Sequence, residues 1–135
     1  RLCQTGWIPS RMSRCCCIGL NRIDPARLVL ALTTEADAQR AEQLATALLN
    51  RRLVACVSLM PLCSLYRWEG QLQREQEVQL LMKTSPNQLE HLQEAVLELH
   101  SYETPEWLSW PASASPAYGA WALDHVSSDG SPPAP

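Results

Sequence analysis

Cysteine side chains carry the widest chemistry in this sequence, because a thiolate is both a nucleophile and a ligand for soft metals. Cys56 and Cys63 lie in apolar runs, where a free cysteine usually packs as a small hydrophobic residue. Cys56 and His100 could act as a nucleophile and its base, but the spacing alone does not bring them together. The adjacent cysteines at 15–17 could bind a soft metal, although neighbouring residues rarely converge on one ion. Packing is therefore the favoured interpretation of Cys56.

Motifs of the common enzyme classes are absent from the sequence. It contains no Gly-rich phosphate-binding loop, no Gly-x-Ser-x-Gly nucleophile elbow and no His-Glu-x-x-His metal-binding helix. We therefore predict a non-enzymatic protein.

The length, charge and composition of the chain exclude several classes of protein. The chain of 135 residues is long enough for one domain with one core, and its formal net charge of −3 argues against nucleic acid as a partner. No segment approaches about 18 consecutive apolar residues, so no membrane span is predicted. The cysteines are not spaced through loops as they are in disulfide-rich secreted proteins, which indicates a reducing, cytoplasmic location.

The composition changes between the N-terminal segment and the rest of the chain. Residues 1–26 contain four arginines against Asp24 alone, together with four of the six cysteines. We expect this segment to be an extension outside the core, either a transit peptide or upstream or vector-derived sequence with Met12 as the natural start. The predicted domain spans 27–126, and the polar residues 127–135 are expected to form a flexible tail.

Hydrophobic periodicity predicts a strand followed by a helix. Residues 28–33 form a short apolar run that suits a buried strand. Thr34 then precedes acidic residues in a pattern similar to a capping box, which predicts the start of a helix there. Apolar residues recur at helical spacing over 41–49, and the helix is expected to end near Arg51 and Arg52, where cations suit the helix dipole.

A long hairpin is predicted over 53–84. Its two arms, 53–69 and 72–84, meet at Gly70, and both exceed the usual strand length of about 5–6 residues. Pro61 interrupts the first arm and marks a bulge, a bend or a sheet edge. Such a hairpin overhangs a compact domain, and exposed strand edges invite pairing, so the sequence predicts an oligomer.

Three further elements complete the predicted fold. Ser85, Pro86 and Gln88 form a capping box at the start of a second amphipathic helix. A short strand over 106–111 follows, and a short C-terminal helix is predicted over 115–126. This order is that of an α+β, ferredoxin-like split βαβ fold, in which helices cover one face of an antiparallel sheet. The other face then requires a partner.

Four short motifs along this topology resemble the signatures of the divalent-cation tolerance family, CutA. They are Val-Ala-Cys-Val-Ser at 54–58, Tyr-Arg-Trp-Glu-Gly at 66–70, His-Ser-Tyr-Glu-Thr-Pro-Glu at 100–106 and Tyr-Gly-Ala-Trp at 118–121. The resemblance covers the predicted domain. It implies a ferredoxin-like subunit in a tight homotrimer, with an architecture similar to that of PII signalling proteins. It also implies a role in divalent metal tolerance, for which copper binding has been proposed.

The resemblance also implies a metal ligand. His100 stands where the family has a histidine before a Pro-Tyr pair, and we predict it as a ligand of Cu(II) or another divalent metal, with Cys56 or Glu106 joining it. Leu99 and Leu32 stand where some family members carry further ligands, a second His and a Cys. One imidazole makes a poor site, so a helix-terminal histidine favoured by the dipole is the open alternative.

A set of aromatic and acidic residues is expected at an inter-subunit cleft or interface, because the corresponding regions approach one another in the family. Anchoring of the interface is the favoured interpretation, and a cleft for a small ligand is the other. The alternative function is accordingly a PII-like trimeric sensor that binds a small ligand and signals to an unidentified partner protein. The set comprises Trp68, Glu69, Lys83, Tyr102, Glu106, Tyr118 and Trp121.

Several residues depart from the family pattern. Gln71 replaces a frequent lysine, and Ser101 replaces the proline before the tyrosine. Trp107 and Trp110 replace smaller aliphatic residues of the last strand. These departures leave the predicted fold unchanged. They affect which ligand this chain is expected to bind.

Overall fold

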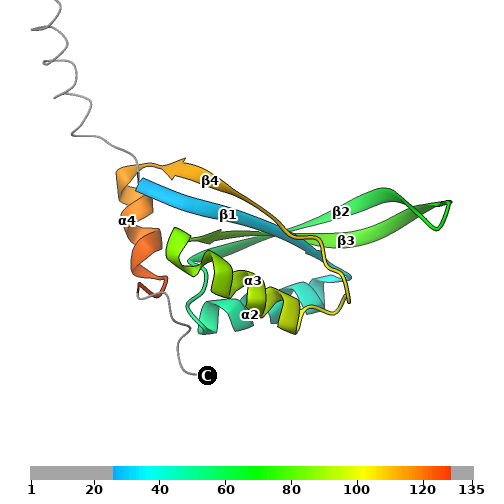
Figure 1. The fold of residues 1–135 in the computed structure, drawn as a ribbon, viewed down its shortest axis with the longest axis horizontal. Coiled ribbons are helices and arrows are strands. Elements are labelled where there is room, and N and C mark those ends of the chain that lie inside the picture. The colour runs from blue at the N-terminus through cyan, green and yellow to red at the C-terminus, as the bar shows by residue number, and fades with distance from the viewer. Residues whose placement is uncertain (1–25, 129–135) are drawn as a thin grey trace, which may run out of the picture.

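The computed structural model describes residues 26–128, which form a four-stranded antiparallel sheet with helices (Figure 1). Of the predicted extension 1–26, residues 1–25 lie outside the described residues, as does the end of the predicted tail, 129–135, whereas Ala26 already pairs with Ala114 in the sheet. The α+β class and the predicted order of elements are confirmed. In chain order the elements are β1 (Ala26–Glu35), α2 (Ala38–Asn50), β2 (Cys56–Trp68), β3 (Gln71–Thr84), the 3-10 helix η2 (Pro86–Gln88), α3 (Leu89–Leu99), β4 (Leu108–Ala114) and α4 (Pro116–Asp124).

The strands lie in the order β2-β3-β1-β4, and each neighbouring pair is antiparallel. Helices α2 and α3 lie on one side of the sheet, whereas α4 lies at the end where β1 begins (Figure 1). None of the helices within 26–128 is long and apolar enough to cross a membrane. Strands β2 and β4 are the two edges of this sheet, so their outer backbone groups have no strand partner in the described part of the chain.

The core lies between the sheet and helices α2 and α3. Alternate residues of β3 point into it, and Val78, Leu80 and Met82 are buried as the period-two pattern predicted. Helix α2 contributes the predicted apolar stripe from Ala41 to Leu48, but Leu49, which was predicted to belong to it, is 43% exposed. A smaller apolar cluster holds α4 against the sheet and contains Leu28, Ala55, Ala122 and Val126.

Strands β2 and β3 pair without interruption along the whole hairpin. The register runs from Cys56 opposite Lys83 to Trp68 opposite Gln71, with one residue facing one residue throughout. Pro61 therefore causes no bulge. It is tolerated because β2 is an edge strand, which is one of the predicted outcomes.

The hairpin turn consists of Glu69 and Gly70, whose φ angles are both positive, at 50° and 79°. Two consecutive left-handed residues are typical of a type I′ turn, whose twist matches that of the flanking strands. Glycine adopts this conformation freely, but glutamate is strained in it. The hairpin then extends well beyond the rest of the sheet (Figure 1).

The start of α2 differs from the prediction. Thr34 does not cap the helix, because β1 continues through Glu35, which pairs with Val78 of β3. The N-cap is Asp37, whose carboxylate accepts a hydrogen bond from the backbone N–H of Arg40 at 2.8 Å. Pairing with β3 satisfies backbone groups that a helix beginning at Thr34 would have left unpaired, so the strand prevails over the local capping pattern.

The start of the second predicted helix also differs. Ser85 makes no capping hydrogen bond with its side chain, and the 3-10 turn η2 precedes α3. The Gln88 side chain is buried, and its amide donates to the carbonyl oxygen of Ser127 at 3.2 Å instead of reaching back to Ser85. The predicted capping box is therefore wrong.

Two boundaries near the C-terminal end are shifted. Strand β4 begins at Leu108, whereas the sequence predicted a strand over 106–111. Ser127, the first residue of the predicted tail, is held by the domain, because its N–H donates to the carbonyl oxygen of Arg52 at 3.0 Å.

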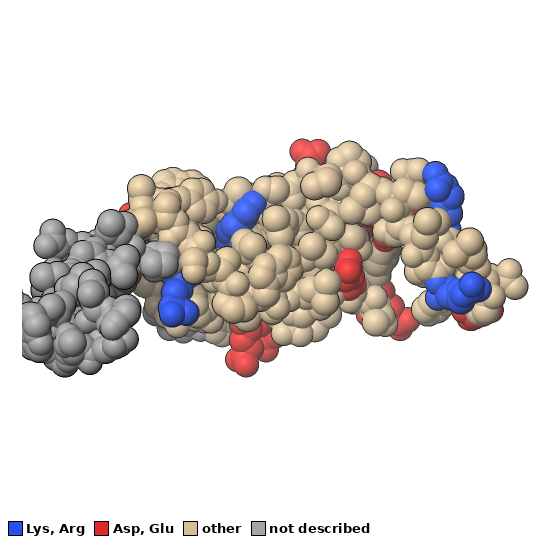
Figure 2. Space-filling view, turned by 90° about the horizontal axis from the view of Figure 1, so that it is seen from above, with Lys and Arg blue, Asp and Glu red and all other residues tan. Residues whose placement is uncertain are grey.

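The sheet face opposite α2 and α3 is open and exposes large apolar side chains. Figure 2 views the molecule from this side, and uncharged surface fills most of its middle. Leu108 and Trp110 of β4 lie on this face, with 52% and 41% of their surface exposed. Contiguous exposed apolar surface usually marks an interaction site, so this face suits a covering chain.

Candidate functional site

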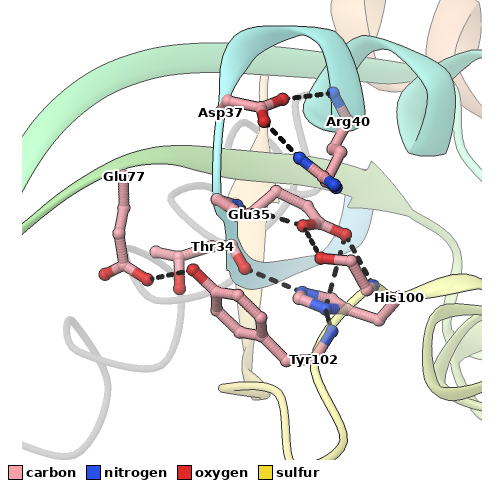
Figure 3. A network of polar contacts seen from close by, with 9 residues as sticks. Thr34, Glu35, Asp37, Arg40, Glu77, His100 and Tyr102 are labelled. Atoms are coloured by element: carbon pink, nitrogen blue, oxygen red, sulfur yellow. Dashed lines mark hydrogen bonds and ion pairs between the residues drawn. The ribbon is translucent and has the colours of Figure 1, made fainter.

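A buried polar cluster lies where the end of α3 meets the end of β1 (Figure 3). His100 is at its centre, and none of its side chain is exposed. Its Nε2 lies 2.7 Å from the carbonyl oxygen of Thr34, and its Nδ1 lies 3.0 Å from the backbone nitrogen of Tyr102. A carbonyl only accepts and a backbone N–H only donates, so Nε2 donates to Thr34 and Nδ1 accepts from Tyr102, and Nδ1 also lies 3.4 Å from Oε2 of Glu35. Both nitrogens of the predicted metal ligand are thus hydrogen-bonded within the chain.

Glu35 is the buried carboxylate of the cluster. It accepts hydrogen bonds from the backbone N–H of Ser101 at 2.9 Å, from the Ser101 hydroxyl and from the N–H of Ala36 at 3.0 Å. Burial raises the pKa of Glu35, but the hydrogen bonds from Ser101 and Ala36 outweigh it and hold the pKa below its ordinary value. The cluster therefore stabilises a carboxylate inside the fold.

Tyr102 connects this cluster to the surface (Figure 3). Its ring centroid lies 5.0 Å from that of His100, and its hydroxyl donates to Oε2 of Glu77 at 2.8 Å. Burial, and then the hydrogen bond to the negative Glu77, raise the pKa of Tyr102 far above its ordinary value. The phenol therefore stays protonated at neutral pH and holds the Glu77 carboxylate in place.

An open groove of about 1090 Å³ lies between the hairpin and the loop that joins α3 to β4. We call it the acidic groove. Its aromatic and charged lining comprises Tyr66, Trp68, Tyr102, Glu75, Glu77 and Glu106. The remaining lining residues are Thr34, Ala36, Ser64, Leu65, Gln73, Thr104 and Pro105, so no lysine or arginine among the described residues lines it. Figure 2 shows a hollow toward the hairpin end of the molecule, with acidic side chains at its border.

A second tyrosine–glutamate pair lies on the hairpin side of the acidic groove. The Tyr66 hydroxyl donates to Oε1 of Glu75 at 3.3 Å. Burial, followed by the negative charge of Glu75, raises the pKa of Tyr66, so this hydroxyl also remains a donor. Glu75 and Glu77 are two residues apart on one face of β3, about 7 Å along the strand. The negative charges of these carboxylates attract cations to the groove.

A separate cluster lies where β2 begins, at the other end of the hairpin. The Lys83 ammonium lies 3.9 Å from Sγ of Cys56 and donates to the Ser58 hydroxyl at 2.6 Å. Burial, and then the neighbouring Cys56, raise the pKa of Tyr118 of α4 above its ordinary value. A positive ammonium beside the thiol repels an approaching metal cation, so this geometry does not favour Cys56 as a metal ligand.

Aromatic rings continue along the exposed side of α4. The ring centroids of Tyr118 and Trp121 are 5.6 Å apart, and those of Trp121 and His125 are 4.7 Å apart. Tyr118 and Trp121 keep 42% and 45% of their surface exposed in the single chain. Large exposed aromatic side chains are typical of interface anchors.

The residues predicted to share one cleft thus fall into two groups within a chain. Trp68, Tyr102 and Glu106 line the acidic groove, and Glu69 lies beside it in the hairpin turn. Lys83, Tyr118 and Trp121 lie at the far end, about 40 Å from Trp68 along the paired strands.

The predicted metal ligands are likewise dispersed. His100 is buried with both nitrogens engaged, Cys56 lies beside Lys83, and Glu106 lines the acidic groove. Within 26–128, no group of three or more His, Cys, Asp or Glu side chains is arranged to hold a metal ion. A metal bound to this part of the chain would need further ligands from water or from another copy.

Three carboxylates of the site were not predicted: Glu35, Glu75 and Glu77. Glu35 follows Thr34 and the short apolar run 28–33, and an acidic residue ending a buried strand was a signal for a buried carboxylate. Glu75 and Glu77 are separated by one residue in a predicted strand, which already places them on one face. The loop that faces them could not be identified from spacing.

The sequence matches a known protein family and several of its members. The model of the CutA1 divalent ion tolerance protein family matches residues 29–125. The divalent-cation tolerance protein CutA of Yersinia pestis is 39% identical over 92 residues, which cover 67% of this chain and 77% of that protein.

Solved structures agree with this match. CutA from Synechococcus elongatus is 40% identical with a TM-score of 0.75, and the match covers 78% of this chain and 95% of that one. The divalent cation tolerance protein from Thermus thermophilus is 35% identical with a TM-score of 0.70, covering 74% of this chain and 99% of that one. Since sequence, fold and motif order agree over most of the chain, it belongs to the CutA1 divalent ion tolerance family.

Proposed function

We propose that this chain acts in divalent-cation tolerance as a non-enzymatic homotrimer whose acidic groove binds cations. The observation that carries the proposal is the lining of the groove. Glu75, Glu77 and Glu106 border it, and none of the lining residues in the described chain is basic. Carboxylates gathered in a concave surface focus a negative potential and raise the local concentration of cations.

The open sheet face supports the homotrimer. Leu108 and Trp110 expose apolar surface there, and β2 and β4 are edges to which another chain can pair. Burial of apolar surface contributes about 25 cal/mol per Å², so covering this face favours assembly. In a closed ring the hairpin of one subunit can reach α4 of the next, which would join Trp68 and Lys83 in one inter-subunit cleft.

Native mass spectrometry tests the assembly and reports subunit number and bound mass together. We expect a trimer of the 15.1 kDa chain. A stable monomer at micromolar concentration would contradict the proposal.

Cu(II) is the first metal to test, and the test compares the carboxylates of the acidic groove with His100, both of whose ring nitrogens are hydrogen-bonded within the chain. The full chain with Cys15, Cys16 and Cys17 replaced by serine is titrated with Cu(II) by calorimetry, because this triplet could bind copper by itself. Glu77→Gln is then compared with His100→Ala.

Loss of affinity in Glu77→Gln alone supports the acidic groove as the metal site. Loss of affinity in His100→Ala alone moves the site to the imidazole and confirms the ligand predicted from the sequence. Cu(II) binding unchanged by both substitutions, or no binding, contradicts metal binding at either place.

A second candidate function is the PII-like trimeric sensor, which binds a small ligand and signals to a partner protein. The size and the aromatic walls of the acidic groove favour it, because about 1090 Å³ bordered by three aromatic rings exceeds the need of a metal ion. Thermal unfolding with metabolites and metals separates the two functions. Stabilisation by an organic ligand without metal supports the sensor, and stabilisation by metal alone supports the metal-binding role.

We also propose a cytoplasmic location. Cys56 and Cys63 of the described chain are free thiols, and Cys63 is exposed, which suits a reducing compartment. Cell fractionation tests this location, and recovery of the protein from an organelle would contradict it.

A further inference from the structure

We infer that Lys83 on the open sheet face forms an ion pair with Glu69 in the hairpin turn of a second copy of this chain. The inference rests on the proposed homotrimer and goes further than it, because it assigns the charged contact that joins one copy to the next. Two observations carry it: an ammonium group on that face without an anionic partner, and a strained glutamate at the end of the overhanging hairpin.

Lys83 lies in the interior of the open sheet face. Its neighbours across the strands are Cys56 of β2 on one side and Leu30 of β1 on the other, and Trp110 of β4 lies next to Leu30. Residues directly opposite each other in antiparallel strands point to the same face, so these four side chains form one row across the sheet. Since β3 is a central strand, a chain that covers this face buries Lys83 away from both sheet edges.

The Lys83 ammonium has a hydroxyl and a thiol as its partners in the described chain. It donates to the Ser58 hydroxyl at 2.6 Å and lies 3.9 Å from Sγ of Cys56, and none of the ion pairs within 26–128 involves it. Burial of an ammonium is costly unless an anion pairs with it. The covering chain must therefore bring a carboxylate to this point.

Glu69 is the carboxylate that the hairpin offers. Glu75 and Glu77 are held by tyrosine hydroxyls of their own chain, whereas Glu69 forms no hydrogen bond or ion pair within 26–128. Glu69 also adopts a φ of 50°, a conformation in which glutamate is strained and asparagine or glycine is preferred. Such strain is typical of residues kept for a contact that the turn itself does not need.

The hairpin is long enough to bring Glu69 to Lys83 of another copy. Strand β1 pairs with β3 only from Val78 onward, so residues 71–77 extend beyond β1 (Figure 1). At about 3.3 Å per residue this overhang measures about 23 Å, whereas four strands spaced about 4.8 Å apart span about 14 Å. The turn of one copy can therefore cross an edge strand of another copy and reach its β3.

Reversal of the two charges tests the pairing. Native mass spectrometry of the full chain compares Lys83→Glu, Glu69→Lys and the variant with both changes. We expect each single variant to dissociate at micromolar concentration, because it sets two like charges against each other, and the double variant to recover the oligomer with the signs exchanged. Glu42→Lys, a charge reversal at an exposed residue of α2, is the matched control and should leave the oligomer intact.

Neutral substitutions keep the test decisive if a reversed charge prevents folding, which circular dichroism detects. Lys83→Gln and Glu69→Gln should each raise the dissociation constant of the assembly by roughly tenfold or more. Once one of them has been made, the other should add less than about threefold, because the pair is already broken.

The results that overturn the inference differ from those that overturn the homotrimer. A wild-type chain that stays monomeric contradicts the homotrimer itself. An oligomeric wild type whose single variants stay intact, or whose folded double variant stays dissociated, excludes the ion pair and leaves the homotrimer standing. Dissociation by Lys83→Glu with none by Glu69→Lys also excludes this pair, because another carboxylate then faces Lys83.

Discussion

Thr34 and His100, 66 positions apart in the sequence, are joined by a buried hydrogen bond of 2.7 Å from the imidazole Nε2 to the carbonyl oxygen of Thr34. This bond fastens the end of α3 to the end of β1. Nδ1 of the same ring accepts a hydrogen bond from the backbone N–H of Tyr102, and the Tyr102 hydroxyl in turn donates a hydrogen bond to Glu77. His100 therefore helps to position the Glu77 carboxylate of the acidic groove, although His100 itself does not line the groove.

His100→Ala should destabilise the fold by about 2–4 kcal/mol, because it opens a cavity and leaves the carbonyl of Thr34 and the N–H of Tyr102 without their partner. Urea denaturation measures the loss. His91→Ala, which alters a partly exposed histidine of α3, is the matched control and should cost less than about 1 kcal/mol. Equal losses in the two variants would show that the buried hydrogen bonds of His100 contribute little.

Glu35 should make the protein less stable in acid. Burial raises its pKa, but the hydrogen bonds from Ser101 and Ala36 prevail, so the folded value lies below the ordinary 4.5. A group with a depressed folded pKa stabilises the fold fully above its unfolded pKa and loses this contribution as the pH falls through the folded pKa. Glu35→Gln should therefore flatten the decline of the unfolding free energy below about pH 4.5.

Urea denaturation of the two proteins between about pH 3 and 7 measures this difference. Ser101→Ala should move the pKa of Glu35 back toward its ordinary value, which an NMR titration of the carboxyl group can follow. A parallel decline in the wild type and in Glu35→Gln would assign the acid sensitivity to other carboxylates.

The hairpin turn offers a stabilising substitution. Glu69 is strained at a φ of 50°, whereas Asn-Gly is the preferred pair in a type I′ turn. In a chain kept monomeric by Leu108→Glu, Glu69→Asn should raise the free energy of unfolding by about 0.5–1 kcal/mol. Gly70→Ala should lower it by about 1 kcal/mol, because alanine is disfavoured at a φ of 79° even where its methyl group would meet no neighbour. Thermal denaturation that shows the same sign for both variants would contradict this account of the turn.

The open sheet face gives a prediction for assembly. Leu108→Glu places a charge where we propose that subunits meet, so it should dissociate the oligomer and lower the melting temperature by removing the stabilisation that assembly supplies. Leu97→Glu makes the same change at a residue of α3 that is equally exposed, at 50%, on the helical side of the sheet. Light scattering should show the oligomer intact in that control. An intact oligomer in Leu108→Glu would move the interface elsewhere.

The order and type of the elements followed from the sequence because their signals are local. The apolar alternation over Val78, Leu80 and Met82 and the stripe from Ala41 to Leu48 each report one buried face of one element. The boundaries failed where a distant partner competed with a local pattern. Thr34 was predicted as a helix cap, but pairing of Glu35 with Val78 of β3 keeps it within the strand.

The candidate site depended far more on tertiary structure. The sequence by itself determined that Glu75 and Glu77 share a strand face, that Trp68 lies at the hairpin turn and that His100 ends a helix. Only the folded chain decided that Tyr102 faces Glu77, that both nitrogens of His100 are engaged, and that Trp68 and Lys83 lie at opposite ends of a hairpin. Periodicity specifies which side of an element a residue occupies, but the antiparallel register and the path of the connecting loops decide which elements face one another. The register and the loop paths are in turn set by contacts between residues far apart in the chain.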